Sequence, residues 1–271
     1  MVKFKSILKW SFIVLALCFI YAPIAFLTVY SFNEGDAIEV GWKGFSWTHY
    51  SYFFNFNNEP IQVVLQTILL ALVVALTSTI LGTIGSIGIY YSHKRVNGIL
   101  SAMNRIPVIN AEVVTAISFA LFVSFFSIDK STFIPLILGQ TILCTPFVVL
   151  SVIPKLKQMD NNLYEAALDL GSTPTRALFS VVIPQILPGI LAGFMLSVTL
   201  SLDDYVIAAY TKPDTFQTIS THIYGLSKNN IQGPTIKAAY WAFTAIIFLI
   251  IIIAVITINV LSYRKTRSKK K

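Results

Sequence analysis

Long apolar runs separated by short polar connections dominate the pattern of hydrophobic and polar positions along this chain. A helix needs about 20 mainly apolar residues to cross the hydrocarbon core of a membrane. Six segments reach that length, so the pattern predicts an all-α membrane protein with six transmembrane helices. The predicted spans are 10–32, 62–91, 107–127, 133–154, 179–203 and 239–262. We expect Pro184 and Pro188 to kink the fifth span near its start, because proline cannot donate a helical hydrogen bond.

The composition also favours a membrane protein over a soluble one. Only 12% of the 271 residues are charged, whereas about 25% are charged in a typical soluble domain. The net charge of +8 raises the alternative of a nucleic-acid binder. The basic residues, however, stand in short stretches between apolar runs and do not alternate with aromatic residues on a polar surface. We therefore expect no nucleic-acid partner.

The distribution of lysine and arginine predicts the orientation of the spans. Cytoplasmic connections of membrane proteins are enriched in these residues. Of the 20 basic residues, fifteen lie in the N-terminal segment, the second and fourth connections and the tail 264–271, so both termini are predicted to be cytoplasmic. The first apolar run starts at Trp10 and is longer than the ~7–15 apolar residues of a secretory signal, so we expect it to remain as a span. We expect residues 1–271 to form a single transmembrane domain whose basic tail contacts lipid headgroups.

The fourth connection, residues 155–180, has the pattern of two short surface helices. Each helix has candidate capping residues before it, and a glycine suited to a left-handed backbone follows the first. The candidate caps are Asp160 or Asn161 and Ser172 or Thr173, the stop is Gly171, and Pro174 lies in the first turn of the second helix. Such a pair either docks on a soluble partner or lies at the membrane surface without one. The residue pattern leaves both alternatives open.

The same connection contains a motif that resembles the EAA signature of the permease subunits of ABC importers. The signature reads Glu-Ala-Ala, three residues, Gly, nine residues and Ile-x-Leu-Pro, and the isoleucine and leucine are conservatively replaced here. The matching residues are Glu165, Ala166, Ala167, Gly171, Val181, Ile183 and Pro184. The resemblance implies the MetI-like permease fold. It further implies that the first four of these residues dock a coupling helix, within 160–180, on a separate ATPase dimer.

The chain contains no GxxxxGK[ST] loop to hold nucleotide phosphates. We therefore expect ATP and its Mg to be bound by the partner ATPase, with no cofactor in this chain. No Ser/His/Asp, paired-His or HExxH arrangement suggests catalysis, and no cysteine or histidine spacing suits a metal, so neither an enzyme nor a metal site is expected. A secondary transporter or channel that needs no ATPase is the less favoured alternative.

Three acidic residues lie in or beside the predicted spans. A charged side chain at the centre of a transmembrane helix costs roughly 2.5–3.5 kcal/mol, so such residues are candidates for function. Glu112 lies just over one turn into the third span, and Asp203 and Asp204 follow the fifth apolar run. With Tyr205, whose ring can attract an ammonium group, they form a candidate cation path. At most one aspartate is expected to face the path, and the alternative is that the pair caps a helix or binds a lysine of another subunit.

A second resemblance concerns the substrate. The run 196–208 reads LSVTLSLDDYVIA and resembles the SFTLSxDDxVI stretch of spermidine/putrescine permeases of the PotC type. Segments 21–33 and 41–50 resemble the same group, and the resemblance extends over nearly the whole chain. It implies a polyamine importer in a bacterial cell membrane, in which this chain is paired with a PotB-like permease, the ATPase dimer and an extracytoplasmic polyamine-binding protein. An ABC permease for another small solute is the alternative.

Two further sets of residues suggest close packing between spans. Ser78, Gly82 and Ser86 recur every four residues in the second span, which is the small-xxx-small pattern of tightly packed membrane helices. Gln140 and Cys144 lie on a polar strip of the fourth span. That strip either lines the path or forms hydrogen bonds between helices, and the sequence leaves both alternatives open.

Overall fold

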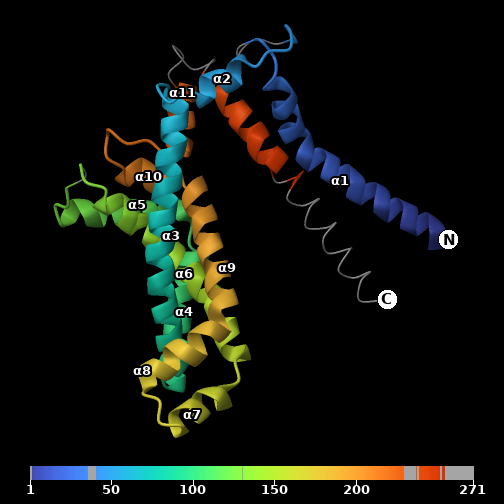
Figure 1. Cartoon of the computed structure of the whole chain (residues 1–271). Coiled ribbons are helices and arrows are strands. Elements are labelled where there is room, and N and C mark those ends of the chain that lie inside the picture. Colours follow the sequence, from blue (N-terminus) through green and yellow to red (C-terminus); the bar gives the residue numbers. More distant parts are fainter. Residues whose placement is uncertain are drawn as a thin grey trace. The chain divides into compact units, whose positions relative to one another are not determined.

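The computed structural model of the chain is all-helical, which confirms the predicted fold class (Figure 1). It describes residues 2–35, 41–129, 131–228, 236, 238–250 and 252–253. The helices are α1 (Val2–Tyr30), α2 (Thr48–Phe54), α3 (Glu59–Tyr91), α4 (Lys94–Ile109), α5 (Glu112–Phe125), α6 (Ile134–Gln158), α7 (Asn161–Asp169), α8 (Pro174–Ala177), η1 (Leu178–Val182), α9 (Ile183–Asp203), α10 (Val206–Thr211) and α11 (Ile219–Lys228). Their contacts define two units, Met1–Gln62 with Gly225–Lys271, and Val63–Tyr224.

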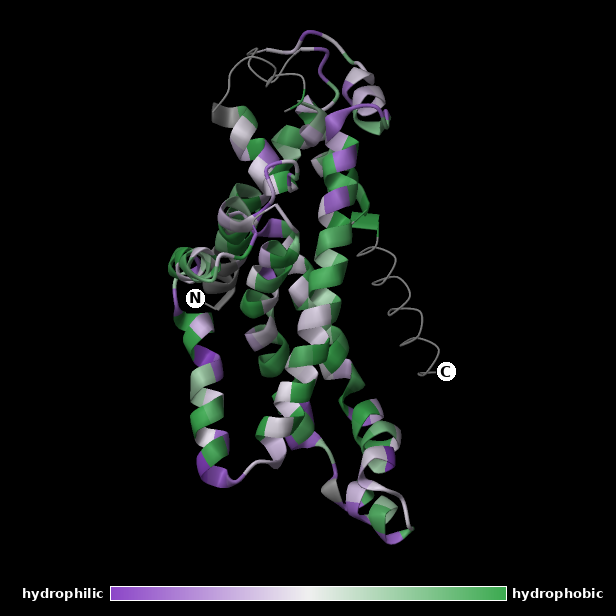
Figure 2. Ribbon diagram, turned by 90° about the vertical axis from the view of Figure 1, so that its left-hand side faces the viewer, coloured by the Kyte–Doolittle hydropathy of each residue, from purple (hydrophilic) through white to green (hydrophobic). Residues whose placement is uncertain are grey.

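Within the described residues, four helical segments are long and apolar enough to cross a membrane. They are Trp10–Tyr30, Glu59–Tyr91, Ile134–Gln158 and Pro174–Asp203. Figure 2 shows hydrophobic residues along most of their length, with hydrophilic residues concentrated at helix ends and connections. The predicted first, second, fourth and fifth spans each fall on one of these helices. A shorter apolar helix, Ala238–Ile250, lies in the predicted sixth span, whose end and the tail 264–271 lie outside the described residues.

The predicted third span differs from the structure in its extent. Residues 94–109 form a helix, α4, where the sequence suggested a connection that continued to 106, and the chain bends by 103° before α5. Asn110 and Ala111 have extended backbone at this bend, with ψ of 147° and 133°. Glu112 is therefore the first residue of α5. The two helices together are long and apolar enough to form one broken span, with Glu112 beside the break. The sequence did not predict the earlier helix start or the break, because α4 is amphipathic and its polar residues interrupt the apolar run.

Helices α3, α6 and α9 pack closely around Val148 of α6. A Cβ atom at Gly82 of α3 would lie 2.6 Å from the Val148 Cβ, and one at Gly193 of α9 would lie 3.1 Å from its Cα. Ser78 and Ser86 are fully buried on the same helix as Gly82. These contacts confirm the prediction that the small-residue face of the second span serves close helix packing, since a glycine lets two backbones approach.

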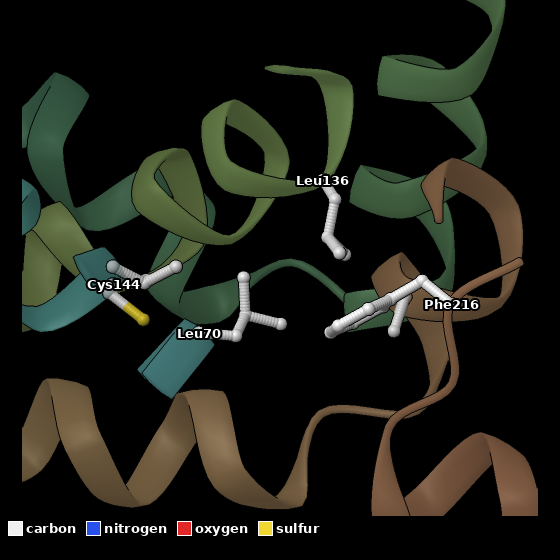
Figure 3. Packing of buried hydrophobic residues seen from close by; sticks show 6 residues of the cluster. Leu70, Leu136, Cys144 and Phe216 are labelled. Carbon is white, nitrogen blue, oxygen red and sulfur yellow. The ribbon is translucent and has the colours of Figure 1, made fainter. Parts of the chain in front are cut away.

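A buried apolar cluster joins α3, α6 and the connection after α10 (Figure 3). Leu70, Leu136, Cys144 and Phe216 are its labelled members. The Phe216 ring points toward Leu70, and the Leu136 side chain points into the space between them. Such burial of apolar area stabilises the unit at about 25 cal/mol per Å² relative to water. The cluster fixes the part of the unit in which α9 ends and α10 begins.

The predicted kink of the fifth span takes the form of a π-helical turn. Residues Leu178–Val182 form this turn between α8 and α9, and Pro184 is the second residue of α9. Proline lacks the N–H that would donate to the carbonyl four residues earlier, so the α-helical ladder is interrupted there. Segment 174–203 is nevertheless helical over 30 residues.

The other unit contains α1, α2 and the helix 238–250. Asn33, after α1, accepts a 2.8 Å hydrogen bond from the Lys43 N–H and donates one of 2.9 Å to the Gly41 carbonyl, so both ends of the connection between α1 and α2 are held together. His49 of α2 is buried against this loop, with Nε2 2.9 Å from the Asn33 carbonyl oxygen. Phe53 of α2 stacks on Phe243, with ring centroids 5.3 Å apart.

Candidate functional site

Two interrupted helices meet in the unit formed by residues 63–224. The first interruption lies between α4 and α5, and the second lies between α9, which ends at Asp203, and α10, which begins at Val206. Helix α5 lies across the direction of α3 and α9 (Figure 1), and it packs against α10. Ala116 of α5, Leu143 of α6 and Ile207 of α10 form the buried contact. Each interruption has a carboxylate beside it, because Glu112 starts α5 and Asp203 ends α9.

Asp204 is buried and holds the second interruption together. Only 2% of its surface is exposed. Its carboxylate accepts 3.0 Å hydrogen bonds from the backbone N–H groups of Ile207 and Ala208, which have no helical acceptor at the start of α10. The structure thus gives Asp204 the helix-capping role that was the alternative to a place in the path.

Gln140 of α6 connects this cap to a neighbouring helix. Its Nε2 donates to Asp204 Oδ2 at 2.7 Å, and its Oε1 accepts from the Ser201 hydroxyl at 2.7 Å. Both Gln140 and Ser201 are buried. Of the two alternatives left open for the polar strip of the fourth span, the structure therefore supports hydrogen bonding between helices for Gln140. The sequence signal for this role was a glutamine inside an apolar run, since a buried amide needs partners.

The remaining acids and tyrosines lie on the exposed side of the interruption. Asp203 and Glu112 are exposed, and the Glu112 carboxyl interacts electrostatically with Asp203 and Asp204. The Tyr205 ring is half-buried and lies 4.7 Å from the Tyr224 ring. We call Glu112, Asp203, Tyr205 and Tyr224 the acidic–aromatic patch. Two carboxylates and two aromatic rings attract a cation and repel an anion. In the described part of the chain, no group of three or more His, Cys, Asp or Glu residues is placed to hold a metal ion.

The predicted surface helices are present in the fourth connection. Asp160 accepts a 3.0 Å hydrogen bond from the Asn162 N–H and so caps α7, and Thr173 accepts one of 3.4 Å from Arg176 and caps α8. Gly171 has φ of +85° after the end of α7. Its N–H donates to the Leu168 carbonyl at 2.9 Å, and the next N–H donates to the Ala167 carbonyl at 3.0 Å. This is a Schellman motif, which requires a left-handed residue and explains the glycine.

The two faces of α7 have different environments. Tyr164 packs against a buried cluster of α6 and α9 that contains Val152, Leu156 and Ile186. The other face displays apolar side chains, because Leu163 is 51% exposed and Leu170 is 89% exposed. Among the residues of the EAA motif, Glu165 and Ala166 are exposed and Ala167 is half-buried. Helix α7 is therefore anchored to two membrane helices on one side and uncovered on the other.

Residues 3–268 match the family described as "Binding-protein-dependent transport system inner membrane component". The chain belongs to this family. It is therefore an inner membrane component of a transport system and a multi-pass membrane protein, as the sequence predicted. Relatives with similar sequences cover nearly the whole chain. The spermidine/putrescine transport system permease protein PotC of Haemophilus influenzae is 29% identical, over 96% of this chain and 98% of that protein. The putrescine transport system permease protein PotI of Escherichia coli is also 29% identical, over 84% of this chain and 83% of its own length.

Solved structures of ABC transporters have the same fold as this permease chain. The crystal structure of a bacterial ABC transporter involved in the import of the acidic polysaccharide alginate aligns with a TM-score of 0.65, over 96% of this chain and 95% of that chain. The inward-facing MetNI methionine ABC transporter aligns with a TM-score of 0.54, over 73% of this chain and 91% of that chain. The sequence identities are 18% and 17%, so this likeness establishes the fold and not the substrate.

Proposed function

We propose that this chain is a permease subunit through which an ATP-driven importer of a bacterial cell membrane moves polyamines inward. The observation that carries the proposal is the acidic–aromatic patch at the two helix interruptions. Protonated polyamines are flexible chains of ammonium groups, which carboxylates attract by charge and aromatic rings attract through their faces. The names of the PotC and PotI relatives support the same substrate class.

The patch has the properties of a transient site and not of a tight one. Asp203 and Glu112 are both exposed and are not enclosed by this chain, so a cation bound there is released readily. Asp204 contributes indirectly, because its buried carboxylate fixes the start of α10 and with it the backbone next to Tyr205. The proposed cation contacts are therefore Glu112, Asp203 and Tyr205, with Asp204 as a positioning residue.

We further propose that α7 is the coupling helix, which docks on a separate ATPase dimer that binds ATP and Mg. The uncovered apolar face, with Leu163 and Leu170, is suited to a groove in a soluble partner. Glu165, Ala166, Ala167 and Gly171 are the proposed docking residues. The remaining partners are a second, PotB-like permease subunit and an extracytoplasmic polyamine-binding protein.

The packing around α7 supports a mechanical connection between this docking helix and the patch. Tyr164 and Leu178 contact the buried cluster of α6 and α9, so a displacement of α7 acts on both helices. Gln140 and Asp204 lie toward the opposite ends of the same two helices. At 1.5 Å per residue, Gln140 is about 27 Å from the end of α6 that is close to α7. Closure of the ATPase dimer would then change the arrangement of the interrupted helices that carry the patch.

Transport by the reconstituted importer tests the proposal directly. We would measure ATP-dependent uptake of labelled spermidine and putrescine into proteoliposomes, with an anionic solute as the control. We expect saturable polyamine uptake that Asp203→Asn reduces and Asp129→Asn does not. Asp129 is a suitable control because it is an exposed carboxylate in another connection, where hydrogen bonds from Ser131 hold its pKa below the ordinary value. An assembled complex that hydrolyses ATP but takes up no polyamine would leave the permease role standing and reject the substrate.

A further inference from the structure

A pocket with two basic residues in its lining lies between α4 and α6, away from the acidic–aromatic patch. It has a volume of about 210 Å³. The two helices contact each other, and the Asn104 side chain donates a 3.3 Å hydrogen bond to the Pro146 carbonyl beside the pocket. The lining residues are Ser101, Asn104 and Arg105 of α4 and Leu150, Ile153, Pro154 and Lys157 of α6.

The lining combines two positive charges with hydrogen-bond donors and contains no acidic residue. Arg105 and Lys157 supply the charges from opposite helices, and Ser101 and Asn104 supply a hydroxyl and an amide. Arg105 lies roughly three turns into α4, and its side chain is exposed next to the pocket. A planar guanidinium is well suited to a phosphate, which it can hold through two parallel hydrogen bonds.

The pocket residues of α6 change from apolar to basic along the helix. This matches a phospholipid, which has apolar acyl chains and a charged headgroup. Leu150 and Ile153 are apolar, and Lys157 follows within two turns, next to the end of the helix that is predicted to be cytoplasmic. On α4, Met103 and Ile106 are 59% and 62% exposed on either side of the pocket residues. Acyl chains can therefore lie against apolar side chains while a headgroup reaches the two cations.

We propose that this pocket binds the phosphate group of an anionic phospholipid from the cytoplasmic leaflet. Arg105 and Lys157 would hold a phosphate group in either of two ligands. The ligand that we favour is the lipid headgroup, and the alternative is a free phosphate ion. At a share of roughly 30 Å³ per water molecule, the volume is enough for a phosphate group together with part of its glycerol. A lipid bound there would join α4 to α6 on the far side of the bend that positions Glu112. The proposal is independent of which solute is transported.

Binding of short-chain lipids to the assembled importer in detergent tests this proposal. The probes are dihexanoyl phosphatidylglycerol, its zwitterionic phosphatidylcholine counterpart and inorganic phosphate, each titrated by calorimetry. We expect Arg105→Gln and Lys157→Gln each to weaken phosphatidylglycerol binding about fivefold, since a basic residue at a membrane surface contributes about that much. Lys155→Gln is the matched control, because Lys155 lies in the same last turn of α6 and does not line the pocket.

The outcomes distinguish a bound lipid from a bound phosphate ion, and both from a variant that fails to fold. Lys157→Arg keeps the charge and should bind within about twofold of the unsubstituted chain, which shows that the glutamine variants lose charge and not structure. Saturable binding of inorganic phosphate that depends on the same two residues, without lipid binding, would overturn the lipid and leave a site for a free anion. Equal effects of Lys155→Gln and Lys157→Gln would overturn the site altogether. Equal binding of phosphatidylcholine would overturn its preference for an anionic lipid.

Discussion

Gln140 donates a hydrogen bond of 2.7 Å to Asp204, and both side chains are buried. This contact joins the N-terminal part of α6 to the interruption between α9 and α10. Because Asp204 also accepts from two backbone N–H groups at the start of α10, the amide completes a network in which the buried carboxylate has three donors. A buried charge is tolerated only with such partners. The network therefore fixes the backbone that carries Asp203 and Tyr205.

Removal of the amide should weaken this network. We expect Gln140→Leu to lower the stability of the chain by about 1–3 kcal/mol, because Asp204 and Ser201 each lose a buried partner. Thermal unfolding of the purified chain in detergent measures this effect. Thr199→Ala on α9 is a suitable control, since Thr199 is exposed and hydrogen-bonds only within its own helix. An unfolding midpoint of Gln140→Leu equal to that of the control would contradict the network.

The two adjacent aspartates should respond differently to neutralisation. Asp203→Asn removes an exposed charge, so we expect unchanged unfolding and an increase of about three- to tenfold in the KM for polyamine uptake. Asp204→Asn places an amide group where Gln140 and two backbone N–H groups donate, so we expect a lower unfolding temperature as well as reduced uptake. Unfolding and uptake measured on the same preparations distinguish the two. Identical behaviour of both variants would argue against separate positioning and contact roles.

Gly82 should be more sensitive to substitution than a nearby glycine of the same helix. A Cβ at Gly82 would lie 2.6 Å from the Val148 Cβ, whereas one at Gly88 would meet nothing within 4 Å. We therefore expect Gly82→Ala to destabilise the chain by about 1–3 kcal/mol through overpacking. Gly88→Ala should be neutral or slightly stabilising, because alanine favours a helix. The unfolding temperatures of the two variants measure this difference in stability. Equal unfolding temperatures would contradict close packing of α3 and α6 at Gly82.

Substitution of Gly171 should affect the structure through its backbone conformation and not through contacts with neighbouring atoms. A Cβ there would meet nothing within 4 Å, yet φ is +85°. We expect Gly171→Ala to cost about 1–2 kcal/mol locally, because non-glycine residues disfavour the left-handed backbone, and to fray the end of α7. The measurement is the amount of ATPase that co-purifies with the chain, which should fall. Gly98→Ala in α4, which also meets no atom within 4 Å, should leave it unchanged. Retained ATPase with Gly171→Ala would count against docking through α7.

The sequence predicted the fourth connection, residues 155–180, in more detail than any other segment. Its caps, glycine stop and two helices depend on interactions within a few residues, such as Asp160 with Asn162 and Gly171 with Leu168, so local chemistry is sufficient. The third span was predicted less well. Helix α4 has one apolar face and one polar face. No local sequence signal predicts the 103° bend that follows it.

The sequence by itself determined the membrane fold class, the helices that are long and apolar enough to span, and the motif that identifies an importer permease. These properties follow from hydrophobicity and from short-range backbone chemistry, which act wherever the chain lies. Only the tertiary structure decided which of Asp203 and Asp204 is exposed, and that Gln140 lies beside the buried one. The physical reason is that a buried carboxylate is stabilised by donors far away in the chain, which meet it only after α6 and α9 have packed.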